Sequence, residues 1–283
     1  MAENIVIANP EKLEDIKKRI AEGGAGKLHI LSDFDRTLTT AFIEGKSIPS
    51  LISILRDGNY LTPDYGSKAQ ALYDKYHRIE IDSTVPAAEK KKAMQEWWEI
   101  HFNLLIKSRL NKKDIERAVD AGKVKFRDGF GKFIDFLKTR NIPLVIISSS
   151  GLGADAIKMY LEKEGKLYEN VYIISNSFEW NKEGYAVAVK KPIIHGMNKD
   201  ETLIRDFPAF EAIKDRKNVL LLGDSLDDVG MVVGFDAENL IKIAFLNEKV
   251  EENLESYKKA FDAVILNDGS MEYVNSLLKS IML

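Results

Sequence analysis

Two aspartates separated by one residue, Asp33 and Asp35, directly follow the mostly apolar run of residues 28–32. Glycines at 23, 24 and 26 bound this run upstream, which predicts a short buried strand. Strand side chains two residues apart point the same way, so both carboxylates can face one pocket at the carboxyl end of the strand. Two acids so close repel each other, so either a cation lies between them or one stays protonated. Alone, such a pattern is also typical of solvated turns.

Three further polar clusters follow downstream, each near the end of an apolar run or in a glycine-containing loop. They are Ser148, Ser149 and Ser150 after residues 143–147; Lys199 in the segment H-G-M-N-K-D; and Asp224, Ser225, Asp227 and Asp228 after L-L-L-G. Each cluster has a simpler structural interpretation as a helix cap, a surface lysine or a turn. Their shared position at strand ends favours a joint functional interpretation.

Phosphate monoester cleavage needs a nucleophile, an acid for the leaving oxygen, cations and hydrogen-bond donors. Asp33 can be the nucleophile, forming an aspartyl phosphate, and Asp35 can protonate the leaving alkoxide and then activate water. Asp33, Asp224 and Asp35, the last through its backbone carbonyl, offer hard oxygens for Mg²⁺. Asp228 is expected to support these ligands.

The remaining positive and hydrogen-bonding groups suit the phosphate itself. The hydroxyls of Ser148, Ser149 and Ser150 and the backbone N–H groups of their turn can bind phosphate oxygens. Lys199 offsets the remaining negative charge. The sequence therefore predicts phosphoryl transfer at one edge of a sheet.

The elements that position these residues alternate between strand and helix after residue 128, which predicts an α/β fold with a parallel sheet flanked by helices. We expect helices over 10–21, 129–140, 153–164 and 270–282, strands over 28–32, 143–147, 171–175, 219–222, 241–245 and 263–266, and a hairpin between Phe178 and residues 185–189. Between 42 and 125 no strand is predicted, and helices are expected over 63–77, 86–109 and 111–121. We therefore expect a core domain of residues 1–41 and 126–283, and an inserted helical cap of residues 42–125 that lies over the site.

The composition agrees with a soluble, globular protein of 283 residues with a net charge of −3 and no cysteine. The chain has no excess of basic residues that would indicate nucleic-acid binding. No apolar run is long enough to span a membrane. The segment G-G-A-G-K at 23–27 does not match a phosphate-binding loop and is interpreted as a turn. The expected location is the cytoplasm, because no signal peptide is apparent.

The motifs D-F-D-R-T-L-T, S-S-S-G, Lys199 and G-D-S-L-D-D together resemble the four motifs of the haloacid dehalogenase (HAD) superfamily. Beyond them, G-G-A-G-K-L-H-I-L-S-D-F-D, R-I-E-I-D, E-W-W, I-I-H-G-M-N-K, I-K-I-A-F-L-N-E-K-V and V-N-S-L-L resemble the cytosolic 5′-nucleotidase III (pyrimidine 5′-nucleotidase) family over nearly the whole chain. This resemblance implies a Rossmann-like core, a helical cap, Mg²⁺, and hydrolysis of nucleoside 5′-monophosphates such as CMP, UMP or 7-methyl-GMP.

The resemblance also implies roles for individual residues. Asp33 is the nucleophile, Asp35 the acid and base and Asp224 a metal ligand, while Lys199 and the serines contact the phosphate. Glu80 matches an acid that contacts the nucleoside, and Trp98 an aromatic position that could stack on the base. His101 stands where the family commonly has a small residue.

Two alternatives stay open on the sequence. The extra serine allows two registers of the phosphate-binding motif, of which we favour Ser149-Ser150-Gly151 over a shift to Ser148. The function could also be that of a HAD phosphatase for another small phosphate ester, or of a non-catalytic nucleotide-binding protein. We expect a monomer or a weak homo-oligomer.

Overall fold

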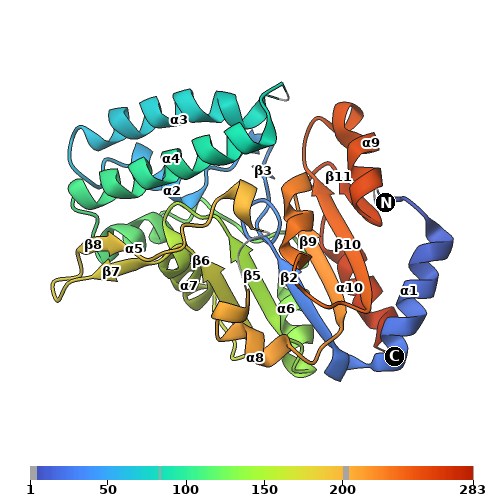
Figure 1. The fold of residues 1–283 in the computed structure, drawn as a ribbon. Helices are drawn as coiled ribbons and strands as arrows, with labels where there is room; N and C mark the ends of the chain where they lie inside the picture. Colours follow the sequence, from blue (N-terminus) through green and yellow to red (C-terminus); the bar gives the residue numbers. More distant parts are fainter. Residues whose placement is uncertain (1–4, 83, 200–203, 283) are drawn as a thin grey trace.

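A seven-stranded sheet forms the centre of the computed structural model, which describes residues 5–82, 84–199 and 204–282 (Figure 1). The strand order is β1-β11-β10-β9-β2-β5-β6, and only β1 runs antiparallel to its neighbour, β11. The bounds are β1 (Ile5–Ile7), β2 (Leu28–Ser32), β5 (Leu144–Ser148), β6 (Val171–Ser175), β9 (Asn218–Gly223), β10 (Asn239–Leu246) and β11 (Ala263–Leu266).

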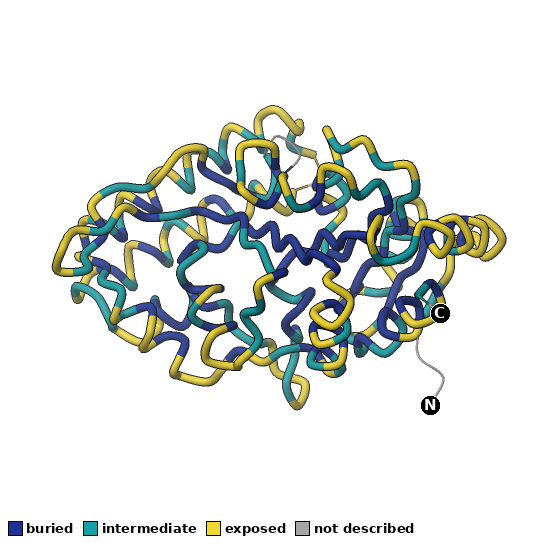
Figure 2. Tube along the Cα trace, turned by 90° about the horizontal axis from the view of Figure 1, so that it is seen from below, coloured by how far each residue is buried: buried dark blue, intermediate teal, exposed yellow. Residues whose placement is uncertain are grey.

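Helices cover both faces of this sheet because its strands are apolar on both sides. In β2, Leu28 and Ile30 belong to one buried cluster and Leu31 to the other, as the alternation of strand side chains requires. The first cluster includes residues of α1 (Pro10–Gly23), α6 (Phe130–Thr139), α7 (Gly153–Lys163) and α10 (Glu272–Ile281), and the second those of α8 (Ala209–Ile213) and the neighbourhood of α9 (Val250–Ala260). Figure 2 shows the buried segments running through the middle of the molecule. Such double coverage is typical of parallel sheets.

A second group of elements lies beyond the carboxyl end of β2 (Figure 1). It comprises β3 (Phe42–Ile43), β4 (Lys46–Ser47), α2 (Leu51–Asp57), α3 (Tyr65–Ile81), α4 (Ala87–Lys107) and α5 (Lys112–Asp120). The hairpin β7 (Phe178–Trp180) and β8 (Ala186–Val189) joins it, since the backbone N–H of Lys112 donates to Gly184 O and that of Ala186 to Leu110 O. A segment from the second half of the chain therefore packs with the helices of the first.

The predicted alternation of strands and helices is confirmed, with element ends that differ by a few residues. Local capping explains the accurate helix starts: the Asn9 side chain accepts a hydrogen bond from Lys12 N, and Asn111 forms a capping box with Asp114. The prediction of no strand between 42 and 125 is wrong, because Phe42–Ile43 pairs with Lys46–Ser47.

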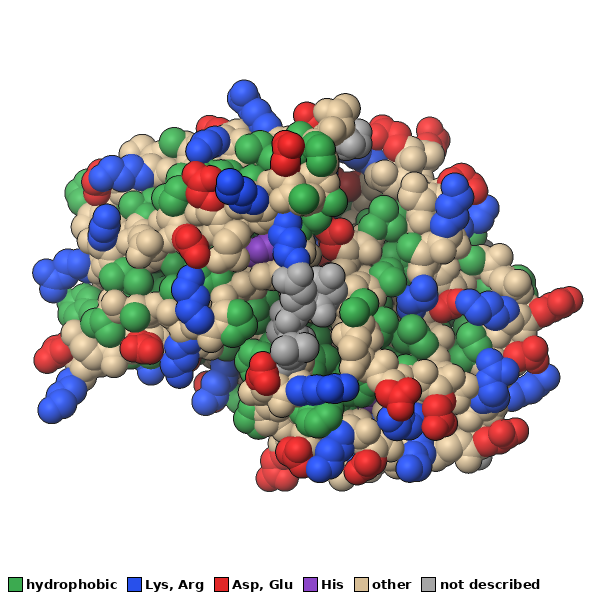
Figure 3. All heavy atoms as spheres, viewed as in Figure 1, with side chains coloured by type: hydrophobic (Ala, Val, Ile, Leu, Met, Phe, Trp, Pro, Cys, Tyr) green, Lys and Arg blue, Asp and Glu red, His purple; other side chains and the backbone are tan. Residues whose placement is uncertain are grey.

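Several short or weakly buried elements were not predicted: β1, α2, α8 and α9. β1 has three residues and owes its conformation to pairing with β11. In α9 the apolar residues Val250, Leu254 and Tyr257 pack against the second cluster, but none of them is fully buried. On the face in Figure 3, side chains of both charges are interspersed. Within the described ranges, no helix combines the length and the apolar character needed to cross a bilayer.

Candidate active site

Asp33 is fixed at the end of β2, an interior strand of the sheet. All five residues of β2 are buried, and β2 pairs with β9 on one side and β5 on the other. The backbone N–H of Asp33 donates to Leu222 O at 3.0 Å, which continues the ladder toward β9. The following residue, Phe34, is fully buried, so the chain leaves the sheet with both aspartates at its carboxyl edge.

The end of β9 carries the second acidic group. The chain turns at Gly223 and Asp224 into a short helix, Leu226–Val232, whose N-cap is Ser225. Asp228 Oδ2 accepts hydrogen bonds from the backbone N–H groups of Asp224 at 3.0 Å and Ser225 at 2.9 Å. A Cβ at position 223 would lie 2.5 Å from Asp228 Cβ, so only glycine permits this approach. The turn and the N-cap expected for this segment are thus confirmed.

Lys199 lies between two of these carboxylates. Its Nζ is 2.7 Å from Asp33 Oδ1 and 2.6 Å from Asp228 Oδ1, and its side chain is 6% exposed. The preceding short helix, Gly196–Asn198, is capped by His195, whose Nδ1 accepts from Met197 N. His195 therefore has a local capping role.

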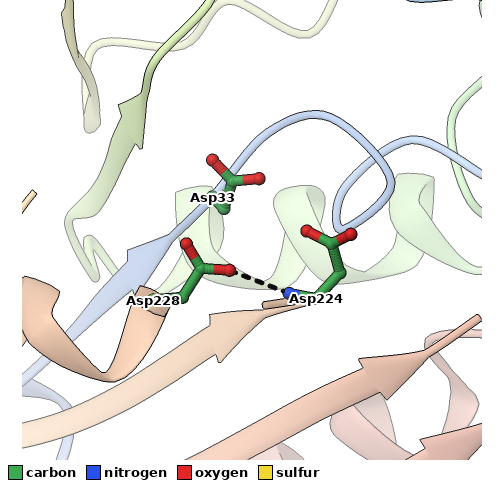
Figure 4. A group of neighbouring side chains, drawn as sticks. All are labelled: Asp33, Asp224 and Asp228. Atoms are coloured by element: carbon green, nitrogen blue, oxygen red, sulfur yellow. Dashed lines mark hydrogen bonds between the residues drawn. The ribbon is translucent and has the colours of Figure 1, made fainter. Parts of the chain in front are cut away.

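Three carboxylates, Asp33, Asp224 and Asp228, come together at this edge (Figure 4). One oxygen from each lies within 4.8 Å of the others. Burial raises the pKa of Asp224 well above its usual range, and repulsion from Asp228 and Asp33 adds to the rise. Closely spaced carboxylate oxygens that repel one another are the donor set that a hard divalent cation such as Mg²⁺ relieves. These residues therefore fit the predicted metal.

The ammonium of Lys199 neutralises part of this negative charge. Burial by itself would lower the lysine pKa, but the carboxylates of Asp228 and Asp33 outweigh it and raise the pKa above the usual value. Burial likewise raises the pKa of Asp33, and Lys199 opposes that rise. One ammonium faces three carboxylates, so the cluster still has negative charge for a further cation.

Asp35 is placed apart from the three clustered carboxylates. Its side chain does not belong to the group that could hold an ion. Burial raises its pKa to about 6, with Lys199 acting in the opposite direction. A carboxyl group that titrates near neutral pH can both donate and accept a proton there.

The serine loop follows β5 and faces the same edge of the sheet. Ser148 Oγ accepts from Ser150 N at 3.2 Å, and Ser150 Oγ accepts from Leu152 N at 3.4 Å. No such bond within the described chain involves the hydroxyl of Ser149, which is half-buried. Asn176 ties this loop to the segment before Lys199, because its side chain bonds both Ser150 O and Ile194 O.

A pocket of about 160 Å³ opens between α2, α3 and α4 beside the serine loop. Trp97, Trp98 and His101 line it from α4, and His101 Nε2 lies 3.4 Å from Gly151 O. Burial lowers the pKa of His101 to about 4, so the ring is neutral at neutral pH. Glu80 does not line this pocket; its carboxylate pairs with His77 Nδ1 at 2.9 Å on the exposed side of α3.

Sequence reasoning missed a buried network that holds the loop after Asp35. Arg127, 2% exposed, donates from Nε to Thr37 O and from Nη1 to Asp268 Oδ1. Asp268 in turn accepts from the backbone N–H groups of Ala41 and Phe42. The segment that leads from the site to the helices is therefore fixed from both sides, which no local pattern could indicate.

Comparison with known proteins places these features in one family. A family model described as pyrimidine 5′-nucleotidase (UMPH-1) matches residues 36–282. The chain is similar to the 7-methylguanosine phosphate-specific 5′-nucleotidase A of Xenopus laevis, with 34% identity over 98% of this chain and 95% of the relative. It is also similar to the crystal structure of cytosolic 5′-nucleotidase IIIB bound to cytidine, with a TM-score of 0.88, 28% identity, and 98% and 93% of the two chains covered.

More distant structures share the fold alone. A HAD family hydrolase from Salmonella enterica superposes with a TM-score of 0.57 at 15% identity, covering 96% of this chain and 81% of that one. The predicted Rossmann-like HAD fold is thereby confirmed.

Proposed function

Because the chain belongs to the pyrimidine 5′-nucleotidase (UMPH-1) family, we propose that it hydrolyses nucleoside 5′-monophosphates to a nucleoside and inorganic phosphate. The predicted resemblance to the cytosolic 5′-nucleotidase III family is confirmed by these comparisons. The observation that carries the proposal is the meeting of Asp33, Asp224 and Lys199 at one edge of the sheet, from three separate stretches of the chain.

In the proposed reaction, a carboxylate oxygen of Asp33 attacks the phosphorus while the bond to the nucleoside 5′-oxygen breaks. Asp35 gives its proton to the leaving oxygen, so the nucleoside departs neutral. Asp35, now a carboxylate, takes a proton from water, which attacks the aspartyl phosphate and frees phosphate and Asp33. The pKa of Asp35, raised to about 6, suits both steps.

Other residues hold the transferred group. Lys199 is within hydrogen-bond distance of Asp33, so its ammonium can meet the phosphoryl charge where it develops. Ser149 is the serine whose hydroxyl stays available for a phosphate oxygen, which favours the register Ser149-Ser150-Gly151; Ser148 and Ser150 shape the turn.

Asp33 and Asp224, with the backbone carbonyl of Asp35, would hold Mg²⁺, and Asp228 would orient them through its bonds to Asp224 N and Lys199. The ion would supply positive charge against the phosphoryl oxygens. Its removal is expected to abolish turnover.

The pocket beside the serine loop is the proposed site of the nucleobase, with Trp98 and His101 in its wall. Trp98 packs against Trp97, His101 and Phe102 and offers a flat apolar surface. Glu80 would reach a nucleoside only from the exposed end of α3. Residues 42–125 would act as the cap over the substrate.

We expect the protein in the cytoplasm, like the solved relative named as cytosolic. It would be a monomer or a weak homo-oligomer. It would act on a small molecule and bind neither nucleic acid nor membranes. The net charge of −3 agrees with that choice of substrate.

A panel assay tests the function. Phosphate release is measured from CMP, UMP, AMP, GMP, 7-methyl-GMP, ribose 5-phosphate and phosphoserine, with Mg²⁺ and with EDTA. We expect Mg²⁺-dependent release from nucleotides, its loss in Asp33→Asn, and no change in Asp15→Asn, an exposed aspartate of α1. Faster release from ribose 5-phosphate or phosphoserine than from every nucleotide would refute the proposed substrate, and an active Asp33→Asn would refute the nucleophile.

A further inference from the structure

The pocket assigned to the nucleobase contains one charged side chain among the described residues that line it, Arg56 at the end of α2. The aromatic rings of Tyr65, Tyr73, Trp97 and Trp98 also line it. No carboxylate of the described chain lines the pocket, so the fixed charge that a bound base meets is positive.

The positive charge of Arg56 is only partly neutralised. Its Nε donates to Asp57 Oδ1 at 2.9 Å, but the Asp57 side chain is 60% exposed against 20% for Arg56. The described residues supply no acceptor for the two terminal nitrogens. These nitrogens are therefore available as hydrogen-bond donors.

Neighbouring groups in the pocket feel this charge. The pKa of His101 is lowered to about 4, first by burial and also by Arg56, so the ring adds no charge at neutral pH. Burial raises the pKa of Tyr65, and Arg56 opposes that rise. The buried Tyr65 hydroxyl has no hydrogen-bond partner among the described residues, which leaves a second polar group in the wall unsatisfied.

The aromatic wall would otherwise favour a cationic base. Cations are attracted to the faces of tryptophan and tyrosine rings. Here the guanidinium of Arg56 itself lies 5.7 Å from the centre of the Tyr73 ring. A positively charged base in the pocket would thus be repelled by a cation that the chain already supplies.

The size of the pocket points to a single ring. Its volume of about 160 Å³ is close to the roughly 150 Å³ of an engineered cavity in another protein that binds benzene. A pyrimidine fits such a space more readily than a purine does.

We infer that Arg56 is a specificity-determining residue that selects neutral, single-ring bases with carbonyl acceptors, uracil and cytosine, and rejects the cationic base of 7-methyl-GMP. This inference rests on the proposed function, because it concerns the base of the same substrate. The preference expected here differs from the substrate that the name of the Xenopus laevis relative gives.

The expected size of the effect follows from the charges. Two unit charges about 6 Å apart, at an effective dielectric constant of about 20, interact by an energy equivalent to about 100-fold in binding. Since Arg56 is partly exposed and paired with Asp57, we expect removal of its charge to change the preference by about 10-fold.

The test compares kcat/KM for UMP and 7-methyl-GMP in the wild type, Arg56→Gln and Arg56→Lys. Arg78→Gln, at an exposed arginine of α3 outside the pocket, is the matched control. We expect the wild type to prefer UMP, Arg56→Gln to shift the ratio about 10-fold toward 7-methyl-GMP, and Arg56→Lys and Arg78→Gln to keep the wild-type ratio within about twofold.

A binding measurement makes the result independent of turnover. Uridine and 7-methylguanosine are titrated while tryptophan fluorescence is followed, since Trp97 and Trp98 line the pocket. An unchanged ratio in Arg56→Gln, or a wild type that prefers 7-methyl-GMP, would overturn the role of Arg56. If no nucleotide released phosphate, the proposed function would fail, and the relative affinities for the two nucleosides would still decide the role of Arg56.

Discussion

Replacing Arg127 by methionine would test whether its buried network holds the loop that follows Asp35. The guanidinium donates to Thr37 O at 2.8 Å, Asp268 Oδ1 at 2.9 Å, Gly269 O at 2.7 Å and Asn247 Oδ1 at 3.0 Å. It lies 4.1 Å from the centre of the Phe245 ring, so methionine would keep part of the packing and lose every hydrogen bond.

The expected loss of stability is large, because the substitution leaves Asp268 and several carbonyls buried without their partner. Burial lowers the pKa of Arg127 to about 10, while Asp268 opposes the shift, so the arginine is charged at neutral pH. Removal of one partner from a buried ion pair costs about 3–5 kcal/mol. In a chain of this size, that loss corresponds to a fall in Tm of about 5–8 °C.

Thermal unfolding followed by circular dichroism at pH 7 measures this effect. Lys132→Met is the matched control, because Lys132 Nζ pairs with Glu272 at 2.7 Å while its side chain is 69% exposed. The control should lose less than about 1 kcal/mol. We also expect Asp268→Asn to destabilise the protein, and the double variant to lose less than the sum of the two single losses.

Activity provides a second measurement on the same variants. The loop between Asp35 and Phe42 is held by Arg127 and Asp268. We therefore expect each variant to have a lower kcat than the wild type even at temperatures well below its melting range. A fall in Tm for Arg127→Met no larger than that of Lys132→Met would refute the reasoning. So would additive losses in the double variant.

Three further predictions concern single residues. Gly223→Ala should place its Cβ 2.5 Å from Asp228 Cβ, displace that carboxylate from Lys199, and cost about 1–3 kcal/mol of stability together with most of kcat; wild-type kinetics would contradict it. Asp35→Asn should lower kcat for a nucleotide by about 10²–10⁴, and less for p-nitrophenyl phosphate, whose leaving group needs little protonation; equal losses on both substrates would argue against its role as the acid. Burial lowers the pKa of His29 to about 4, below its unfolded value of 6.5, so its neutral form stabilises the protein above pH 6.5 and this contribution is lost as the pH falls toward 4. His29→Asn should therefore flatten the loss of unfolding free energy between pH 6.5 and 4 by up to about 3 kcal/mol, measured by urea unfolding at each pH, and a slope equal to that of the wild type would contradict the assignment.

Much of the fold could be predicted from the sequence because its signals are local. The five-residue run before Asp33 is buried on both faces, and the helix that starts at Pro10 is capped by Asn9. The sequence also predicted that Asp33 and Asp224 each follow the end of a strand. They lie at one edge of the sheet because parallel strands bring their carboxyl ends together. Short elements such as β1 were not, because pairing with a distant strand fixes them.

The sequence by itself thus determined which residues could do chemistry and that Asp33, Asp224 and the serines follow strand ends, whereas Lys199 follows a short helix. Only the tertiary structure decided which partners these residues have: Lys199 bonds both Asp33 and Asp228, and Glu80 pairs with His77 and does not line the pocket proposed for the base. Packing between elements far apart in the chain also placed Arg56 in an aromatic wall. The physical reason is that backbone periodicity and caps act within a few residues, whereas burial and the electrostatic field of a side chain depend on every element that packs against it.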